Sequence, residues 1–126
     1  MRRLLLPLLV FSASFALTLY NLNNFPKFIG DEGIYVSQAY SLTTLGELGP
    51  YTYWYDHSPL GWLQIGVWQR LVGVTSFWGS SILTSRVLIA LILSASPTLL
   101  YTLASRVSRS SLIGLLAAAI YGLSAL

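Results

Sequence analysis

The sequence contains no cysteine, and charged side chains make up only 9% of its 126 residues. Without cysteine the chain has no disulfide framework and no thiolate metal site. Apolar residues account for 55% of the chain and the mean hydropathy is +0.67, so the polar side chains are too few to cover a water-soluble domain. The composition therefore predicts an integral membrane protein.

The seven basic residues exceed the four acidic residues, which gives a net charge of +3. Nucleic-acid-binding proteins gather such charge on one continuous face. Here the basic residues are dispersed, so we expect no nucleic acid partner and interpret them as markers of membrane topology. They are Arg2, Arg3, Lys27, Arg70, Arg86, Arg106 and Arg109.

The acidic residues and the single histidine all lie in one polar, aromatic stretch between apolar blocks, from Gly30 to Trp62. A bilayer strongly disfavours burying such a stretch in its hydrocarbon core. Any chemistry is therefore predicted to occur here. The residues concerned are Asp31, Glu32, Glu47, Asp56 and His57.

Three apolar segments, residues 4–20, 82–104 and 112–126, are predicted to be transmembrane helices. At ~1.5 Å per residue the first reaches about 26 Å, enough to cross a ~30 Å hydrocarbon core with interfacial help. A cleaved signal peptide is the alternative, but the apolar run is longer than the ~7–15 residues usual for one. The third reaches only about 22 Å, short of the hydrocarbon thickness, so the sequence is expected to stop inside this helix.

Residues 21–81 are predicted to form a long first extracytoplasmic loop. Arg2 and Arg3 precede the first span, and a short basic loop at residues 105–109 follows the second. Both basic segments lie in the cytoplasm only if residues 60–78, which polar side chains interrupt, lie at the outer interface instead of crossing. We therefore expect a multi-pass plasma-membrane protein with a cytoplasmic N-terminus and a juxtamembrane helix at residues 60–78.

A further helix is predicted over residues 31–45. Asp31 suits its N-cap, Glu32 in the first turn suits the positive end of the helix dipole, and Gly46 suits its C-terminal end. Apolar side chains at helical spacing give it one apolar face, which predicts a helix lying on the membrane surface. That face contains Tyr35, Ala39 and Leu42.

An aromatic-rich segment follows, with the sequence YTYWYDHSPLGW at residues 51–62. Amphipathic rings suit the headgroup region of a bilayer, so the segment is interpreted as an interfacial anchor. A ring-lined pocket for a sugar or a lipid headgroup is the alternative. Composition alone favours the anchor.

Two clusters contain the candidate chemical groups, Asp31–Glu32 and Asp56–His57. Helix capping explains the first cluster without catalysis, and a lone histidine in an aromatic turn is usually structural. No set of His, Asp or Glu residues has the spacing of a zinc site and no phosphate-binding loop is present. We therefore expect no cofactor, with a divalent metal as an alternative that the sequence does not support. What remains is a carboxylate pair on the outer side of a membrane, which could take a proton from an acceptor hydroxyl.

The order of these motifs resembles the start of membrane-embedded glycosyltransferases of the protein O-mannosyltransferase type, which include aminoarabinose lipid A transferases. Asp31, Glu32 and Tyr35 match the acidic motif of the first outer loop in that family. The second motif of the family is matched by His57, Pro59, Leu60 and Trp62. An arginine early in the next span is matched by Arg86. Many members have Lys at the position of His57 and Pro at the position of Ser58.

The resemblance implies an all-α multi-span enzyme, of which residues 1–126 are expected to be the N-terminal part, and it implies a mechanism. A sugar would pass from a polyprenyl phosphate to an acceptor hydroxyl of a glycan, lipid or protein, with inversion. Asp31 would act as general base, and Glu32 would position the site. The residues expected to contact the donor phosphate or the substrate are His57, Arg86, Tyr35 and Trp62.

Two other functions fit the composition less specifically. A small non-catalytic membrane subunit or anchor would use the aromatic segment as a docking surface. An ion or solute carrier is disfavoured because the predicted spans contain no acidic residue near their middle. Continuation of the reading frame into further spans would distinguish the enzyme from the subunit.

Overall fold

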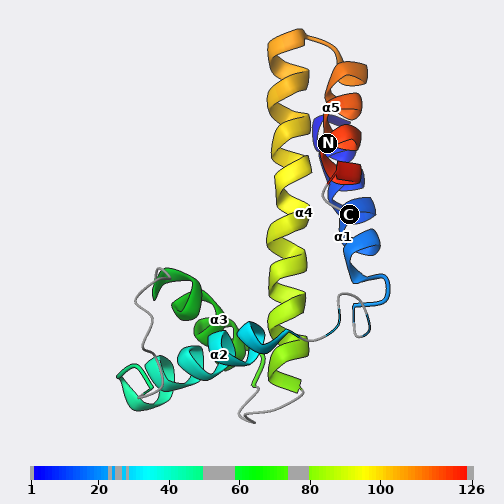
Figure 1. Cartoon of the computed structure of the whole chain (residues 1–126). Coiled ribbons are helices and arrows are strands. Elements are labelled where there is room, and N and C mark those ends of the chain that lie inside the picture. Colours follow the sequence, from blue (N-terminus) through cyan, green and yellow to red (C-terminus); the bar gives the residue numbers. More distant parts are fainter. Residues whose placement is uncertain are drawn as a thin grey trace. The chain divides into compact units, whose positions relative to one another are not determined.

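The structure is a computed structural model that describes residues 2–22, 24, 27, 29–49, 59–73 and 80–124 (Figure 1). Every regular element over these residues is helical, which confirms the all-α part of the predicted fold. The elements are α1 (Arg2–Leu19), α2 (Gly30–Tyr40), the π-helix η1 (Ser41–Leu45), α3 (Pro59–Leu71), α4 (Ser80–Ser108) and α5 (Ser111–Ser124).

The chain divides into two compact units, and the boundary falls within α4. The three-helix unit, Met1–Tyr20 with Ile89–Leu126, contains α1, the greater part of α4, and α5. The loop unit, Asn21–Leu88, contains α2, η1, α3 and the first turns of α4. All four acidic residues belong to the loop unit. The candidate chemistry is therefore confined to one unit.

Among the described helices, α4 alone is long and apolar enough to cross a bilayer. Its apolar stretch, Ser81–Ser108, has 28 residues and extends about 42 Å, more than the ~30 Å hydrocarbon core. The apolar stretches of α1 and α5, Leu4–Leu19 and Ser111–Ser124, are shorter. One of the three predicted spans thus has a helix of sufficient length, which is consistent with a membrane protein.

In the three-helix unit, α5 approaches α4 closely because a glycine lies at the contact. A Cβ atom added at Gly114 would lie 2.8 Å from Ser105 Cβ and 2.9 Å from the Tyr101 carbonyl oxygen. One turn later Ala118 is also buried. Small residues four apart allow close helix packing, as is common between helices in membranes.

The surface of the three-helix unit is largely apolar. Exposed large hydrophobic side chains follow α1, α4 and α5. Those on α4 are Ile89, Ile92, Leu93, Leu99, Leu103 and Val107. Soluble monomers rarely expose so much contiguous apolar surface. We therefore expect lipid or further protein to cover it.

The core of the loop unit lies between α2 and α3. It contains Ala39, Trp62 and Ile65, with Tyr35, Leu42, Leu48 and Leu88 packed against them. The apolar face of α2, which the sequence assigned to the membrane surface, is thus covered by α3. Helical periodicity indicates which face of a helix is apolar, but not what covers that face.

The helix predicted over residues 31–45 begins and ends close to those residues, but Asp31 is not its N-cap. The N-cap is Ile29, whose carbonyl accepts a hydrogen bond from the Glu32 amide at 3.0 Å, and no side chain caps the helix. Asp31 lies inside the first turn. At the other end Gly46 has a left-handed φ of 78°, and its N–H donates to the Ser41 carbonyl at 3.1 Å. The predicted terminal glycine is therefore confirmed.

The last turn of this helix, η1, has π-helical hydrogen bonding, which was not predicted. The Thr43 hydroxyl donates at 2.7 Å to the Ala39 carbonyl, the acceptor that the backbone N–H of Thr43 would use in an α-helix. Gly66 of α3 lies against this turn. A Cβ added there would be 2.3 Å from Thr43 Cγ2 and 2.8 Å from the Ala39 oxygen. The widened turn and the glycine thus occur at one close contact between helices.

α3 is a short helix attached to the beginning of α4. Its 13 residues extend about 20 Å, less than the ~30 Å hydrocarbon core. The Trp68 indole N–H donates to the Thr84 carbonyl at 2.8 Å, and the Gln69 amide donates to the Ser85 hydroxyl at 3.2 Å. Gln69, one of the polar side chains that interrupt the apolar run at residues 60–78, therefore has a partner on α4.

Candidate functional site

The first turn of α2 contains both acidic residues of the first motif, Asp31 and Glu32. Unsatisfied backbone N–H groups give this end of a helix a partial positive charge, which stabilises nearby carboxylates. Consecutive residues of an α-helix project about 100° apart. The two side chains therefore face different surroundings.

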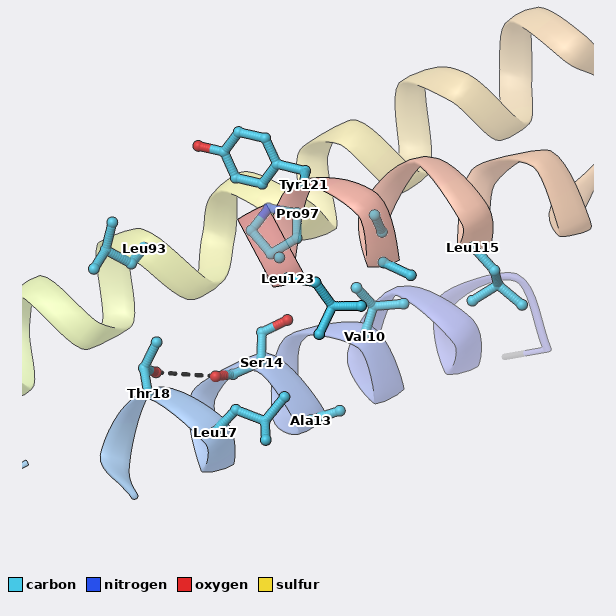
Figure 2. Close-up of a pocket in the computed structure, with 13 residues that line it drawn as sticks. Val10, Ala13, Ser14, Leu17, Thr18, Leu93, Pro97, Leu115, Tyr121 and Leu123 are labelled. Atoms are coloured by element: carbon cyan, nitrogen blue, oxygen red, sulfur yellow. Dashed lines mark hydrogen bonds between the residues drawn. The ribbon is translucent and has the colours of Figure 1, made fainter. Parts of the chain in front are cut away.

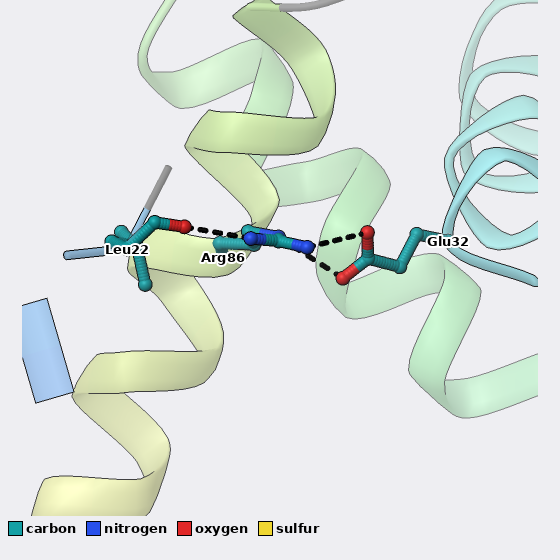
Figure 3. Close-up of polar contacts among 3 residues, drawn as sticks. All are labelled: Leu22, Glu32 and Arg86. Carbon is teal, nitrogen blue, oxygen red and sulfur yellow. Dashed lines mark hydrogen bonds and ion pairs between the residues drawn. The ribbon is translucent and has the colours of Figure 1, made fainter. Parts of the chain in front are cut away.

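Glu32 is bound by Arg86, which extends from the first turns of α4 (Figure 3). Arg86 Nε donates to Glu32 Oε1 at 3.0 Å, and Nη2 donates to Oε2 at 2.9 Å. Arg86 Nη1 donates to the Leu22 carbonyl oxygen at 2.6 Å. A bidentate guanidinium–carboxylate pair restricts the orientation of both groups. Glu32 is therefore held in one position between α2 and α4.

The pair is largely removed from solvent. Arg86 is 7% exposed, and the Glu32 side chain is 26% exposed. Leaving one such charge without its partner costs far more than the intact pair contributes, so the pair specifies how α2 docks on α4. The resemblance assigned Arg86 to the donor phosphate. In the structure the charge of Arg86 is already compensated by Glu32.

Asp31 differs from Glu32 both in its exposure and in its contacts. It is exposed, and its carboxylate makes no hydrogen bond or ion pair with any described residue. Its oxygens can therefore accept a proton from a bound molecule, whereas those of Glu32 are directed at Arg86. Two adjacent acids are thus separated by environment into a structural partner and an open acceptor.

Tyr35 and Trp62 meet through the core of the loop unit. Trp62, on α3, is 4% exposed and is buried with Ala39. Tyr35 lies one turn after Asp31 on α2, is half-buried, and packs against the same core. The Trp62 ring therefore packs in the core beside Ala39 of α2 and does not line an open surface.

The second motif is only partly described. Pro59 and Leu60 form the first turn of α3. Asp56, His57 and the aromatic residues 51–55 lie outside the described residues. The phosphate-binding role of His57, and the anchor or pocket role of the aromatic segment, therefore stay predictions.

No group of three or more His, Asp or Glu side chains in the described part of the chain could hold a metal ion. Glu32, the acid with a fixed orientation, already has Arg86 as its partner. A divalent cation bound by Glu32 would have to displace the guanidinium from its bidentate contact.

Sequence reasoning identified Glu32 and Arg86 as separate candidates but did not connect them. They are 54 residues apart, and no local pattern joins them. It also missed the Leu22 carbonyl, because a backbone acceptor leaves no signal in residue type. The usable signal was that a lone arginine at the start of an apolar helix needs a partner.

An apolar cavity of about 330 Å³ lies in the three-helix unit (Figure 2). Its polar lining groups are Ser14, Thr18 and Tyr121. The Thr18 hydroxyl donates to the Ser14 carbonyl at 2.9 Å and lies 3.3 Å from the Ser94 hydroxyl, which links α1 to α4. None of the described lining residues is an acid, a histidine or a cation. The cavity suits an apolar chain and offers no group for general acid–base catalysis at neutral pH.

Comparison of the chain with protein-family models, with curated proteins and with solved structures finds no match. A function therefore has to be inferred from the residues themselves. The loop unit, with its two unlike acids, is where that inference starts.

Proposed function

We propose that this chain forms part of a membrane-embedded glycosyltransferase that moves a sugar from a polyprenyl phosphate to an acceptor hydroxyl on the extracytoplasmic side. The observation that carries the proposal is the difference between two adjacent acids. Arg86 holds Glu32, while Asp31 is exposed and unengaged by the residues described. A transferase of this kind needs one open carboxylate as a base and a rigid support beside it.

In the proposed reaction, Asp31 accepts the proton of the acceptor hydroxyl. The hydroxyl oxygen attacks the anomeric carbon on the face opposite the phosphate. The new C–O bond forms as the bond to the phosphate oxygen breaks, so the configuration inverts and the electron pair leaves with the polyprenyl phosphate. General-base assistance typically contributes about 10²–10⁴-fold in rate.

Glu32 has the positioning role in this scheme. To act as the base it would have to release Arg86, and a buried guanidinium without its partner costs about 3–5 kcal/mol. Arg86 is accordingly assigned to the support of Glu32. His57 is then the residue proposed for the departing phosphate, to which a neutral imidazole offers a hydrogen-bond donor.

The membrane location is supported by the length of α4 and by the apolar surface of the three-helix unit. We propose a multi-pass plasma-membrane protein with its N-terminus and residues 105–109 in the cytoplasm and residues 21–81 outside. Asp31 then faces the side on which a lipid-linked sugar is presented at the outer leaflet.

Asp31→Asn tests the catalytic assignment. The change keeps the size of the side chain and removes the proton acceptor. Because Asp31 is not the N-cap, no capping bond is lost, so a slower reaction reports chemistry and not a weakened helix. We expect sugar transfer from a polyprenyl-phosphate donor, measured on membranes containing the full-length protein, to slow by about 10²–10⁴-fold.

Glu47→Gln is the matched control. Glu47 is an exposed acid of the same unit, and its neutralisation should leave the rate within about twofold, since it offers no base to the proposed reaction. An Asp31→Asn rate within about threefold of wild type, at equal membrane expression, would contradict the general-base role. That result would favour the non-catalytic membrane subunit.

A further inference from the structure

A cavity of about 310 Å³ lies between the C-terminal ends of η1 and α3 in the loop unit. Its polar lining groups are Tyr40, Thr43, Thr44, Gln69 and Arg70. Gly66 and Gly73 complete the lining and add no side chain. The cavity therefore combines hydroxyl, amide and guanidinium groups with a larger apolar share of its lining.

Arg70 is the charged group of this cavity, and no carboxylate among the described residues lines it. One nitrogen, Nη2, donates to the Thr43 carbonyl oxygen, which orients the guanidinium. Its other N–H groups have no partner within the part of the chain that is described, and the side chain is exposed. Arg70 thus differs from Arg86, whose charge is compensated by Glu32.

An apolar stripe runs along the exposed side of α3, the helix that contains Arg70. It is made by Leu60, Leu63, Val67 and Leu71, at helical spacing. Leu71, next to Arg70, is 78% exposed. A cation with open donors beside an exposed apolar stripe matches the chemistry of an amphipathic anion, which has a charged head and a hydrocarbon body.

The place of α3 in the loop unit brings this helix, which carries the stripe on its exposed side, to the start of α4. Trp68 and Gln69 bind Thr84 and Ser85, which lie in the first two turns of α4. Since α4 is the described helix able to cross a bilayer, a group fixed at its beginning lies near a membrane surface.

We propose that the Arg70 cavity binds the phosphate of an anionic membrane phospholipid, whose acyl chains lie along the α3 stripe. The site is separate from the proposed catalytic one. Asp31 and Tyr40 lie at opposite ends of α2, roughly 14 Å apart along its axis, which is more than one sugar ring can bridge. The Arg70 cavity therefore does not hold the leaving phosphate of a reaction at Asp31.

The electrostatics of the cavity favour an anion of low charge. Helix C-terminal ends are partially negative, and both η1 and α3 end at this cavity, so they offset part of the charge of Arg70. The remaining N–H groups of Arg70 can make charge-assisted contacts to phosphate oxygens, and because Arg70 is exposed, salt should screen them.

The test measures binding of fluorescent phosphatidylglycerol to the purified full-length protein in detergent, with phosphatidylcholine and inorganic phosphate as competitors. We expect phosphatidylglycerol to bind about tenfold more tightly than phosphatidylcholine, a difference of about 1.4 kcal/mol. Arg70→Gln should remove this selectivity. Thr44→Phe should weaken phosphatidylglycerol binding by obstructing the cavity while leaving Arg70 in place. If circular dichroism shows that Arg70→Gln does not fold, Thr44→Phe alone tests the proposed site.

The control is Arg106→Gln, which removes the same charge from an exposed position on α4, in the other unit. Its selectivity should equal that of the wild type. Equal losses in Arg70→Gln and Arg106→Gln would show non-specific attraction and overturn the proposal. Displacement by inorganic phosphate as effective as by phosphatidylglycerol would show a free-anion site and would overturn the phospholipid assignment. Neither result depends on sugar transfer.

Discussion

At the scale of single residues, the pairing of Glu32 with Arg86 decides what each of two neighbouring acids can do. The sequence identified both acids as candidates because charged side chains beside membrane-spanning segments are costly and usually functional. It could not indicate which acid stays open, since that depends on a contact between residues far apart in the chain. Trp62 was expected at the substrate and lies in the core, because an aromatic residue in a polar motif fits either place until its packing is known.

Glu32→Gln should destabilise the protein by about 3 kcal/mol, because Arg86 would stay buried without a counter-charge. Arg86→Met should also destabilise it. The double variant Glu32→Gln/Arg86→Met should lose less than the sum of the two single losses, since no charge is then left buried. Thermal unfolding in detergent, followed by circular dichroism, measures all three.

Glu47→Gln is again the control for the loss of a carboxylate, and its unfolding temperature should stay close to that of the wild type because the side chain is exposed. If the losses of the two single variants simply add in the double variant, the pair does not couple α2 to α4.

At the scale of elements, local signals predicted the helix ends better than the helix partners. The acids of the first turn and Gly46 mark the two ends of the segment formed by α2 and η1, because these signals act within one turn. The cover of its apolar face by α3 was not predicted, and neither was the π-helical turn. Both occur at the close contact of Gly66 with Ala39 and Thr43, which is a tertiary contact that no local pattern indicates.

Gly66→Ala should destabilise the loop unit by about 1–3 kcal/mol, the usual cost of overpacking. The added Cβ would lie 2.8 Å from the Ala39 carbonyl oxygen, which is backbone and cannot rotate away. Gly61→Ala, on the same helix, is the matched control, because nothing lies within 4 Å of its added Cβ. It should be neutral or stabilising by up to ~1 kcal/mol through helix propensity. Equal unfolding temperatures for the two variants would show that α2 and α3 do not pack as described.

At the scale of the whole molecule, composition predicted a membrane protein and the apolar segments predicted helices, and the structure supplies one helix long enough to cross a bilayer. The other two predicted spans stay predictions, because a helix that is apolar but short can cross a membrane or be covered by protein. The positive-inside rule still gives an orientation that can be tested, since it depends only on where the basic residues lie.

Single-cysteine labelling in intact cells tests that orientation, and the cysteine-free chain gives no background. A cysteine at Leu45, which is 64% exposed, should react with a membrane-impermeant reagent added outside. A cysteine at Ser108 should react only after the cells are permeabilised. Labelling of the Ser108 variant in intact cells, without labelling of the Leu45 variant, would reverse the proposed topology.

The apolar stretch of α4 is about 12 Å longer than a ~30 Å hydrocarbon core, and that excess corresponds to about eight residues. The loop unit holds a stretch of that length, because the unit boundary follows Leu88. Under the proposed topology, that stretch of α4 belongs to the loop unit and lies outside the hydrocarbon core. If α4 moved toward the cytoplasm by one turn, ~5.4 Å, Arg86 and its partner Glu32 would approach the hydrocarbon, and the opposite movement would bring Ile89 and Ile92 into water. A thinner or thicker membrane would therefore have to deform around α4.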